Sequence, residues 1–166
     1  MVEKKFVVDG MKLSYNGPFD IIEFYKKVDE WISSKGKEKE IKKKTEHVEP
    51  KGKNIEWFIE IWEDVAEYAR PIVRMRALFT NVKEITVKKG SKGKRLNTGD
   101  VLITFDGILE TDIGGKWQQK PWFYFIRAVI DKFVWKFHTN KFEDKLAADV
   151  DSLYDALSDF FNSYKV

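Results

Sequence analysis

The C-terminal part of this chain constrains its fold more than any other part, because two helical patterns follow one another there. Residues 121–137 and 140–164 each place apolar side chains at the three- and four-residue spacing of an amphipathic helix. The long segments before them alternate apolar and polar residues, as strands do. A helix with one apolar stripe has to bury that stripe against another element. We therefore expect an α+β fold, in which a curved antiparallel sheet packs on a long C-terminal helix and an extra aromatic-rich helix precedes it.

Length and composition narrow the classes of protein that this chain fits. Its 166 residues predict a single domain over residues 1–166. The chain has no cysteine, which excludes disulfide bonds, zinc–thiolate sites and a cysteine nucleophile. It has no apolar run of about 20 residues that would cross a membrane, and its first residues lack the apolar core of a signal peptide. We therefore expect a cytoplasmic protein without a transmembrane segment.

The charged residues are many but nearly balanced. There are 30 basic and 27 acidic residues, so the net charge is only +3. A dedicated nucleic-acid binder usually carries a much stronger basic field, and we do not expect nucleic acid to be the main partner. Heavy use of Lys and Glu without Cys resembles the composition of thermophile proteins, although Lys-rich mesophile proteins share it.

Two Asp-Gly pairs interrupt the alternation of the predicted strands. Residues 6–15 change phase at Asp9-Gly10, which predicts either a small hairpin or one bulged strand. A later strand changes phase at Asp106-Gly107, which again predicts a bulge. Bulges increase the local twist of a sheet, so both positions favour a curved sheet.

The central segments predict a meander of strands. Residues 40–49 are polar and Lys-rich, which fits an exposed edge strand. Residues 55–68 match both a strand and a helix, and we favour the strand because β-branched and aromatic residues dominate. Long alternating strands are expected at 73–87 and 101–113, joined by the Lys-Gly-rich loop 88–95. This loop lacks the spacing of a phosphate-binding P-loop, so we interpret it as a solvated hairpin tip.

Local residues predict where the helices begin and end. The first helix spans residues 18–35, with Pro18 suited to the first turn and Gly36 to the position just after the last. The C-terminal helix is expected to begin at a capping box formed by Asn140 and Glu143, which would separate it from the aromatic-rich helix.

No set of residues predicts catalysis, a metal or a cofactor. The two histidines, His47 and His138, lack the partners of a catalytic triad or a metal site. Asp151, Asp155 and Asp159 form a helical stripe of carboxylates, which is usually only solvated. We therefore interpret all five as ordinary structural or surface residues.

The order of elements resembles that of the START/Bet v 1-like (helix-grip) superfamily. The resemblance rests on the helix at 18–35, the meander over 40–113 and the amphipathic helix at 141–164. It implies a cavity between the sheet and the C-terminal helix that takes lipids or other apolar molecules, and some members are cyclases or chaperone cofactors. No catalytic residue can be carried over by motif. We expect a small protein that binds an apolar or amphipathic molecule, and the sequence favours a binding protein over an enzyme without deciding between them.

The strand pattern gives the residues that such a cavity would use. Its apolar lining would come from residues at alternate strand positions, namely Trp57, Met75, Phe79 and Phe105. Its polar groups would be Glu60, Arg74 and Arg76, provided that their face of the sheet points inward. In that case Glu56 and Glu60 would form an acid/base pair with raised pKa values, whereas on a solvent face they would be ordinary polar residues.

Two other functions stay open. Phe123, Tyr124 and Trp135 lie off the apolar stripe of the helix at 121–137, and exposed aromatics there would form an interaction surface for a homodimer or another protein. The Lys-rich segments at 35–53 and 88–95 would support weak, salt-dependent binding of nucleic acid if they joined into one basic surface.

Overall fold

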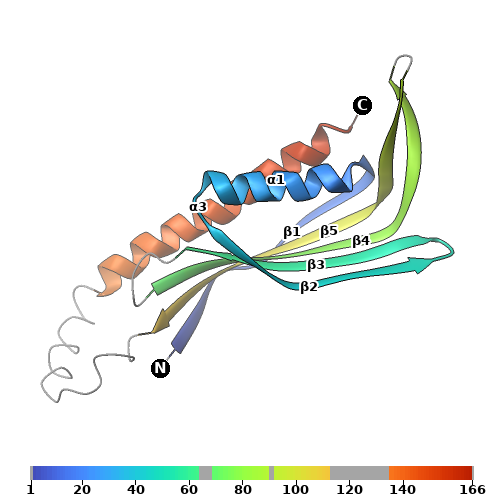
Figure 1. Ribbon diagram of the computed structural model, residues 1–166. Coiled ribbons are helices and arrows are strands. Elements are labelled where there is room, and N and C mark those ends of the chain that lie inside the picture. Colours follow the sequence, from blue (N-terminus) through green and yellow to red (C-terminus); the bar gives the residue numbers. More distant parts are fainter. Residues whose placement is uncertain (1, 64–68, 90–91, 113–134, 166) are drawn as a thin grey trace, which may run out of the picture.

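The computed structural model describes residues 2–63, 69–89, 92–112 and 135–165, which form one antiparallel sheet and two helices (Figure 1). The sheet is open and has the strand order β1-β5-β4-β3-β2. In chain order the elements are β1 (Val2–Phe19), α1 (Ile21–Ser34), β2 (Glu38–Glu49), β3 (Gly52–Trp62), β4 (Ala69–Lys89), β5 (Lys92–Asp112) and α3 (Trp135–Asn162). The α+β class and the antiparallel sheet are therefore confirmed, and β2 is an edge strand as expected.

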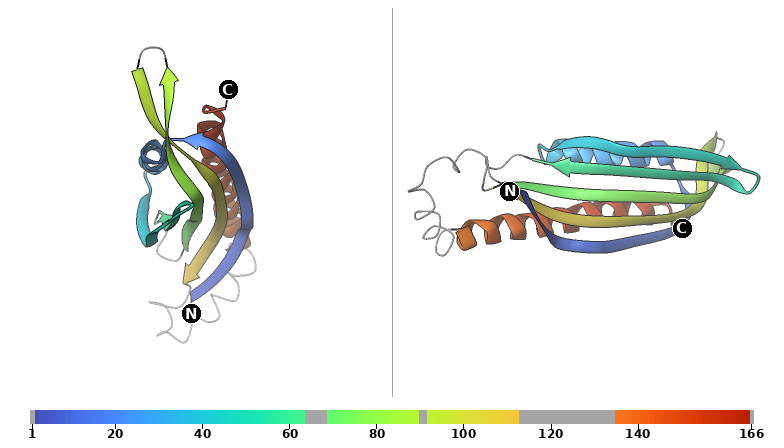
Figure 2. Two further views of the ribbon diagram at one scale, coloured as in Figure 1. Left: turned by 90° about the vertical axis from the view of Figure 1, so that its right-hand side faces the viewer. Right: turned by 90° about the horizontal axis from the view of Figure 1, so that it is seen from below.

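Both helices lie on the same face of the curved sheet. The right-hand view of Figure 2 looks at the opposite face and shows the strands in front of the helices. Every second residue of β3 from Ile55 to Ile61 is buried, because strand side chains alternate between the two faces. The apolar stripe of α3 is buried in the same core, and its fully buried members are Leu146, Val150, Leu153, Leu157 and Phe161. The predicted packing of a long C-terminal helix on the sheet is thus confirmed.

The ambiguous segment at 55–68 is a strand as far as the structure describes it. It contributes to β3, while residues 64–68 lie outside the described residues. Strands β2 and β4 pair with β3 on its two sides, so the sheet satisfies its backbone N–H and C=O groups. Pairing on both sides favours the strand over the helix, although the local sequence fits both.

The N-terminal segment is one bulged strand and not a hairpin. Its register against β5 shifts twice near Gly10, whose φ is +74° and whose N–H donates to Asp106 Oδ1 at 2.8 Å. The predicted bulge at Asp106-Gly107 is wrong, because the extra residues lie in β1 and the pairing of β5 with β4 continues unshifted there. Gly107 instead faces α3, where a Cβ atom would lie 3.2 Å from Val150 Cγ2 and 3.3 Å from Leu146 Cγ.

The first helix starts later than its sequence pattern suggests. Pro18 belongs to β1, and Asp20 is the N-cap residue of α1. The Asp20 carboxylate accepts hydrogen bonds from the N–H groups of Ile22 and Glu23, which would otherwise be unpaired in the first turn. The end of the helix is as predicted, since Gly36 lies just beyond it with φ +65°.

The C-terminal helix starts earlier than expected. It begins at Trp135, so Asn140 lies inside α3 and the predicted capping box is wrong. The chain from residue 135 to residue 145 contains no Gly or Pro that would end or start a helix, and one Asn does not break it. Most of the predicted aromatic-rich helix, residues 121–134, lies outside the described residues, and its last three residues belong to α3.

The Lys-Gly-rich segment at 88–95 is mostly strand and not loop. β4 continues to Lys89 and β5 begins at Lys92, with Lys88 opposite Gly93 in the pairing. Strand pairing thus extends almost to the tip of this hairpin, whereas residues 90 and 91 lie outside the described residues.

Candidate functional site

The four apolar residues expected to contact a ligand do share the face of the sheet that the helices cover. Each is at most 3% exposed, and together they are Trp57, Met75, Phe79 and Phe105. The Phe24 ring of α1 lies edge-on to Trp57 and Phe79, with centroid distances of 5.9 and 5.3 Å. Phe105 has a similar contact with Tyr154 of α3 at 5.8 Å. Helix side chains therefore pack directly on this predicted lining.

The charged residues predicted beside them lie on the other face of the sheet. The Arg74 and Arg76 guanidinium groups are 5.7 and 4.9 Å from the centre of the Phe58 ring. Arg74 Nη2 lies 3.3 Å from Glu60 Oε1, and Arg76 Nε lies 3.7 Å from Glu56 Oε1. These groups do not share a cavity with the apolar lining, because neighbouring strand positions point to opposite faces. Of the two interpretations left open from the sequence, the ordinary polar face is the one that fits. The charged groups form an ion-paired surface network instead.

The three aromatics proposed as an interaction surface cannot be placed. Phe123 and Tyr124 lie outside the described residues. The backbone of Trp135 forms the first residue of α3, but its side chain is not among those described. The interaction hypothesis for residues 121–137 therefore stays a prediction.

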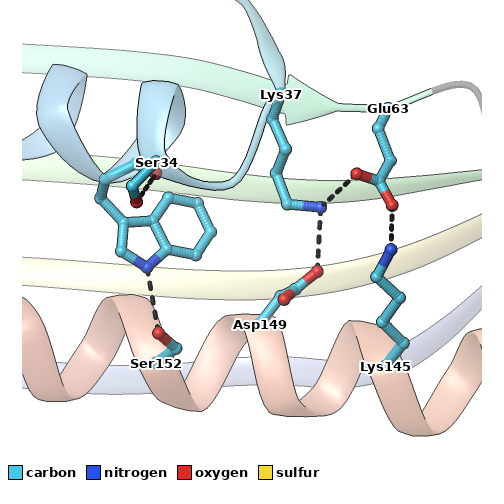
Figure 3. Close-up of polar contacts among 7 residues, drawn as sticks. Ser34, Lys37, Glu63, Lys145, Asp149 and Ser152 are labelled. Carbon is cyan, nitrogen blue, oxygen red and sulfur yellow. Dashed lines mark hydrogen bonds and ion pairs between the residues drawn. The ribbon is translucent and has the colours of Figure 1, made fainter.

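Four charged side chains meet on the helix side of the sheet and form what we call the Lys37 cluster (Figure 3). Lys37 Nζ lies 2.9 Å from Asp149 Oδ2 and 3.5 Å from Glu63 Oε2, and Glu63 also pairs with Lys145. The Lys37 side chain is only 2% exposed, and those of Asp149 and Glu63 are 10% and 17% exposed. The cluster therefore contains a buried ammonium group held by two largely buried carboxylates.

Three parts of the chain bring these charges together. Gly36 turns the chain after α1, and the Lys37 N–H donates to the carbonyl of Ile32, so Lys37 follows the helix end closely. Glu63 comes directly after β3. Lys145 and Asp149 lie one turn apart on α3. The cluster thus joins α3 to the end of α1 and to the end of a central strand.

The two outer members of the cluster have shifted pKa values. Burial alone would raise the pKa of Glu63, but hydrogen bonds and positive charge from Lys145 and Lys37 outweigh burial and hold that pKa below its ordinary value. The hydrogen bond to Glu63 raises the pKa of Lys145 above its ordinary value, although partial burial opposes this effect. Both shifts favour the charged forms of Glu63 and Lys145, so this pair is ionic at neutral pH.

A second polar contact joins the two helices close to the cluster. The Trp31 indole Nε1–H of α1 donates to Ser152 Oγ of α3 at 3.1 Å (Figure 3). Trp31 is itself 7% exposed, so most of its ring is buried while its N–H is satisfied. Fully buried Val150 follows Asp149 in the chain, which places the charges at the border of the apolar core.

Sequence reasoning missed Lys37, Glu63 and Asp149. One indication was present, because Asp149 lies three residues after Leu146 and four before Leu153, on the buried stripe of α3. A carboxylate at such a position needs a cationic partner. The sequence does not name that partner, because Lys37 is more than a hundred residues away.

The remaining candidates whose side chains the structure describes are surface groups. Within the described ranges, no three His, Asp or Glu side chains are grouped to hold a metal ion, and the stripe of Asp151, Asp155 and Asp159 is exposed. His47 is exposed on β2, and the side chain of His138 is not among those described. No helix in the described part of the chain is both long and apolar enough to cross a membrane.

Comparisons with known protein families, with curated proteins and with solved structures find no match to this chain.

Proposed function

We propose that this chain is a binding protein for an amphipathic carboxylate, such as a long-chain fatty acid, and not an enzyme. The apolar tail of the ligand would lie between the sheet and α3, and its carboxylate would bind the Lys37 ammonium. The choice of an apolar tail follows from the topological resemblance to the helix-grip superfamily. The strand order supports that resemblance, since β1 lies beside β5, the last strand of the meander. The C-terminal helix α3 crosses the face of the sheet that α1 also covers.

The observation that carries the proposal is the buried ion pair between Lys37 and Asp149. A buried ammonium needs a carboxylate, and hydrogen bonds between charged partners are short and strong where water is excluded. Asp149 belongs to α3, the element that a ligand under this helix would have to displace. A ligand carboxylate has the same chemistry as the Asp149 carboxylate, so it would replace Asp149 without leaving the ammonium unpaired.

The packed core implies that binding is coupled to movement of α3. Two surface depressions in the described part of the chain, of about 380 and 420 Å³, do not include Trp57, Met75, Phe79 or Phe105 in their walls. The aromatic contacts of these residues fill the space under the helices. The ligand tail would therefore take the place of part of the α3 stripe, and association should be slower than a diffusion-limited encounter.

The proposal can be tested with two probes that share one apolar tail. We expect oleate to bind at least tenfold more tightly than oleyl alcohol in calorimetric titrations of the purified, delipidated protein. In the double variant Lys37→Met with Asp149→Leu, which replaces the ion pair by apolar groups, the preference for the acid should disappear. The matched control is Lys39→Met, since Lys39 is a neighbouring lysine whose ion pair with Asp29 is at the surface. Equal binding of acid and alcohol by the native protein, or binding of neither, would overturn the proposal.

A further inference from the structure

The long hairpin of β4 and β5 extends beyond the rest of the sheet. Pairing of β4 with β3 ends at Val82, and pairing of β5 with β1 ends at Asn97. Residues 83–89 of β4 therefore pair only with β5, and residues 92–96 of β5 pair only with β4; we call these residues the β4–β5 arm. Figure 1 and the left view of Figure 2 show this arm standing clear of both helices. Seven strand residues span about 20 Å.

A bend in the backbone at the base of the arm sets its direction. The register between β4 and β5 shifts there, and Asn81 has a φ of +55°. The Asn81 N–H donates to Asn54 Oδ1 at 3.0 Å, which ties the bend to β3. Opposite it, a Cβ on Gly99 would lie 2.9 Å from the Thr80 carbonyl oxygen, so glycine permits this close approach. The arm is thus a specified extension of the fold.

The arm also concentrates positive charge. Residues 83–95 contain six basic residues and one acidic residue, whereas the whole chain has a net charge of only +3. Four of the basic residues are exposed, namely Lys83, Lys88, Lys94 and Arg95. None of these four forms an ion pair with a carboxylate in the described part of the chain. The lysines of β2 differ, because carboxylates neutralise most of them through the pairs Lys39–Asp29, Lys42–Glu40 and Lys43–Glu56. The two Lys-rich segments therefore differ in how much of their charge is free.

We propose that the β4–β5 arm binds the phosphate backbone of double-stranded DNA, independently of the function proposed above. A two-stranded β-ribbon fits the major groove of B-form DNA, and exposed Lys and Arg without carboxylate partners can contact phosphates. Single-stranded nucleic acid is a poorer fit, because binding it usually needs aromatic side chains for base stacking, and the arm has none. A lipid surface is also a poorer fit, because the arm lacks the aromatic anchors of membrane-bound elements.

The test measures binding of the full chain to a fluorescein-labelled 24-base-pair duplex by fluorescence anisotropy over a series of salt concentrations. We expect binding that weakens steeply with salt. The triple variant Lys88→Ala, Lys94→Ala, Arg95→Ala should lose at least tenfold in affinity at low salt, and its log–log salt slope should fall by about 3. Because these residues pair only within the arm, the variant should keep the far-ultraviolet circular dichroism of the native chain.

The matched control removes the same charge elsewhere. Lys12, Lys35 and Lys141 are exposed and outside the arm, and the triple variant of these residues to Ala should bind within twofold of the native chain. Equal losses in both triple variants would overturn the proposal, since binding would then follow net charge alone. Tighter binding of the corresponding single strand, of duplex RNA or of phosphatidylserine vesicles would also overturn it. If the arm variant fails to fold, the single variant Lys94→Gln, with an expected loss of about threefold, replaces it.

Discussion

At the scale of single residues, Lys37 is the least expected feature of the molecule. Removing an ammonium group from water is costly, and an apolar side chain of similar volume often stabilises a fold equally well or better. Lys37 is nevertheless almost fully buried, with Asp149 and Glu63 as its partners. This arrangement is understandable if the ammonium has a second use, namely the binding of a ligand carboxylate.

The first prediction compares two changes in the free energy of unfolding: removing one charge of this pair, and removing both. Lys37→Met alone leaves Asp149 buried without its nearest cation and should lower the free energy of unfolding by about 3–5 kcal/mol. Adding Asp149→Leu should restore most of that loss, because no unpaired charge then remains at this position. Urea denaturation of the native protein and both variants provides the measurement. A single variant as stable as the native protein would show that the pair is not buried in solution.

The second prediction concerns acid. The pKa of Glu63 is lower in the folded chain than its ordinary value of 4.5, so its contribution to stability is present above that value and is lost as the pH falls below it. Between about pH 6 and pH 3, the native protein should therefore lose more unfolding free energy than the Glu63→Gln variant. The same substitution at the exposed Glu30 serves as the control. Parallel curves for the native protein and Glu63→Gln would contradict the assignment.

At the scale of elements, α3 contributes buried residues to the core between the sheet and the helices. Leu153 and Leu157 are fully buried in the core that α3 shares with the sheet and α1. Each of Leu153→Ala and Leu157→Ala should cost ~2–5 kcal/mol, because apolar contacts are lost and a cavity remains. The exposed Asp155→Ala is the control and should change stability by less than about 0.5 kcal/mol. Losses under about 1 kcal/mol at both leucines would mean that the stripe is not buried.

Side-chain spacing predicted the elements well but not their ends. In β3 apolar and polar residues alternate, and in α3 apolar residues form a stripe, because each element buries one face. Such spacing can be read directly from the sequence. The start of α1 depends on which residue caps its first turn. The sequence pattern placed Pro18 in that turn, whereas Asp20 is the N-cap residue. Similarly, Gly107 provides room for α3 and does not form a bulge. That role depends on two residues of α3, Leu146 and Val150, that lie more than thirty residues away in the chain.

The candidate site was much less predictable than the fold. Strand alternation correctly placed Trp57 and Phe79 on one face, but it could not say whether helix side chains would fill the space above them. It also left open which face of the sheet pointed inward, so it could not decide whether Glu60 and Arg74 belonged to a cavity or to the surface. The Lys37 cluster depends on three segments meeting in space, and no local pattern contains that information.

At the scale of the whole molecule, the described residues separate into surfaces with different chemistry. One face of the sheet is apolar and covered by α1 and α3, and the other carries an ion-paired network around Phe58. Both edge strands contain bulges, and β2 is also rich in lysine, features that discourage pairing with other chains. The basic β4–β5 arm extends from one end of this body. The proposed ligand binding under α3 and the proposed DNA binding by the arm therefore involve separate residues and can be tested separately.

The central claim is that a ligand carboxylate pairs with Lys37, and NMR of oleate labelled with ¹³C at its carboxyl carbon tests it most directly. A carboxylate beside a buried ammonium stays ionised at lower pH than a free one. The bound signal of the native protein should therefore keep the chemical shift of the ionised form to below about pH 4. In the Lys37→Met, Asp149→Leu variant, any bound oleate should titrate at a higher pH, because burial without a cation favours the neutral acid. Identical titration in the two proteins would contradict the account.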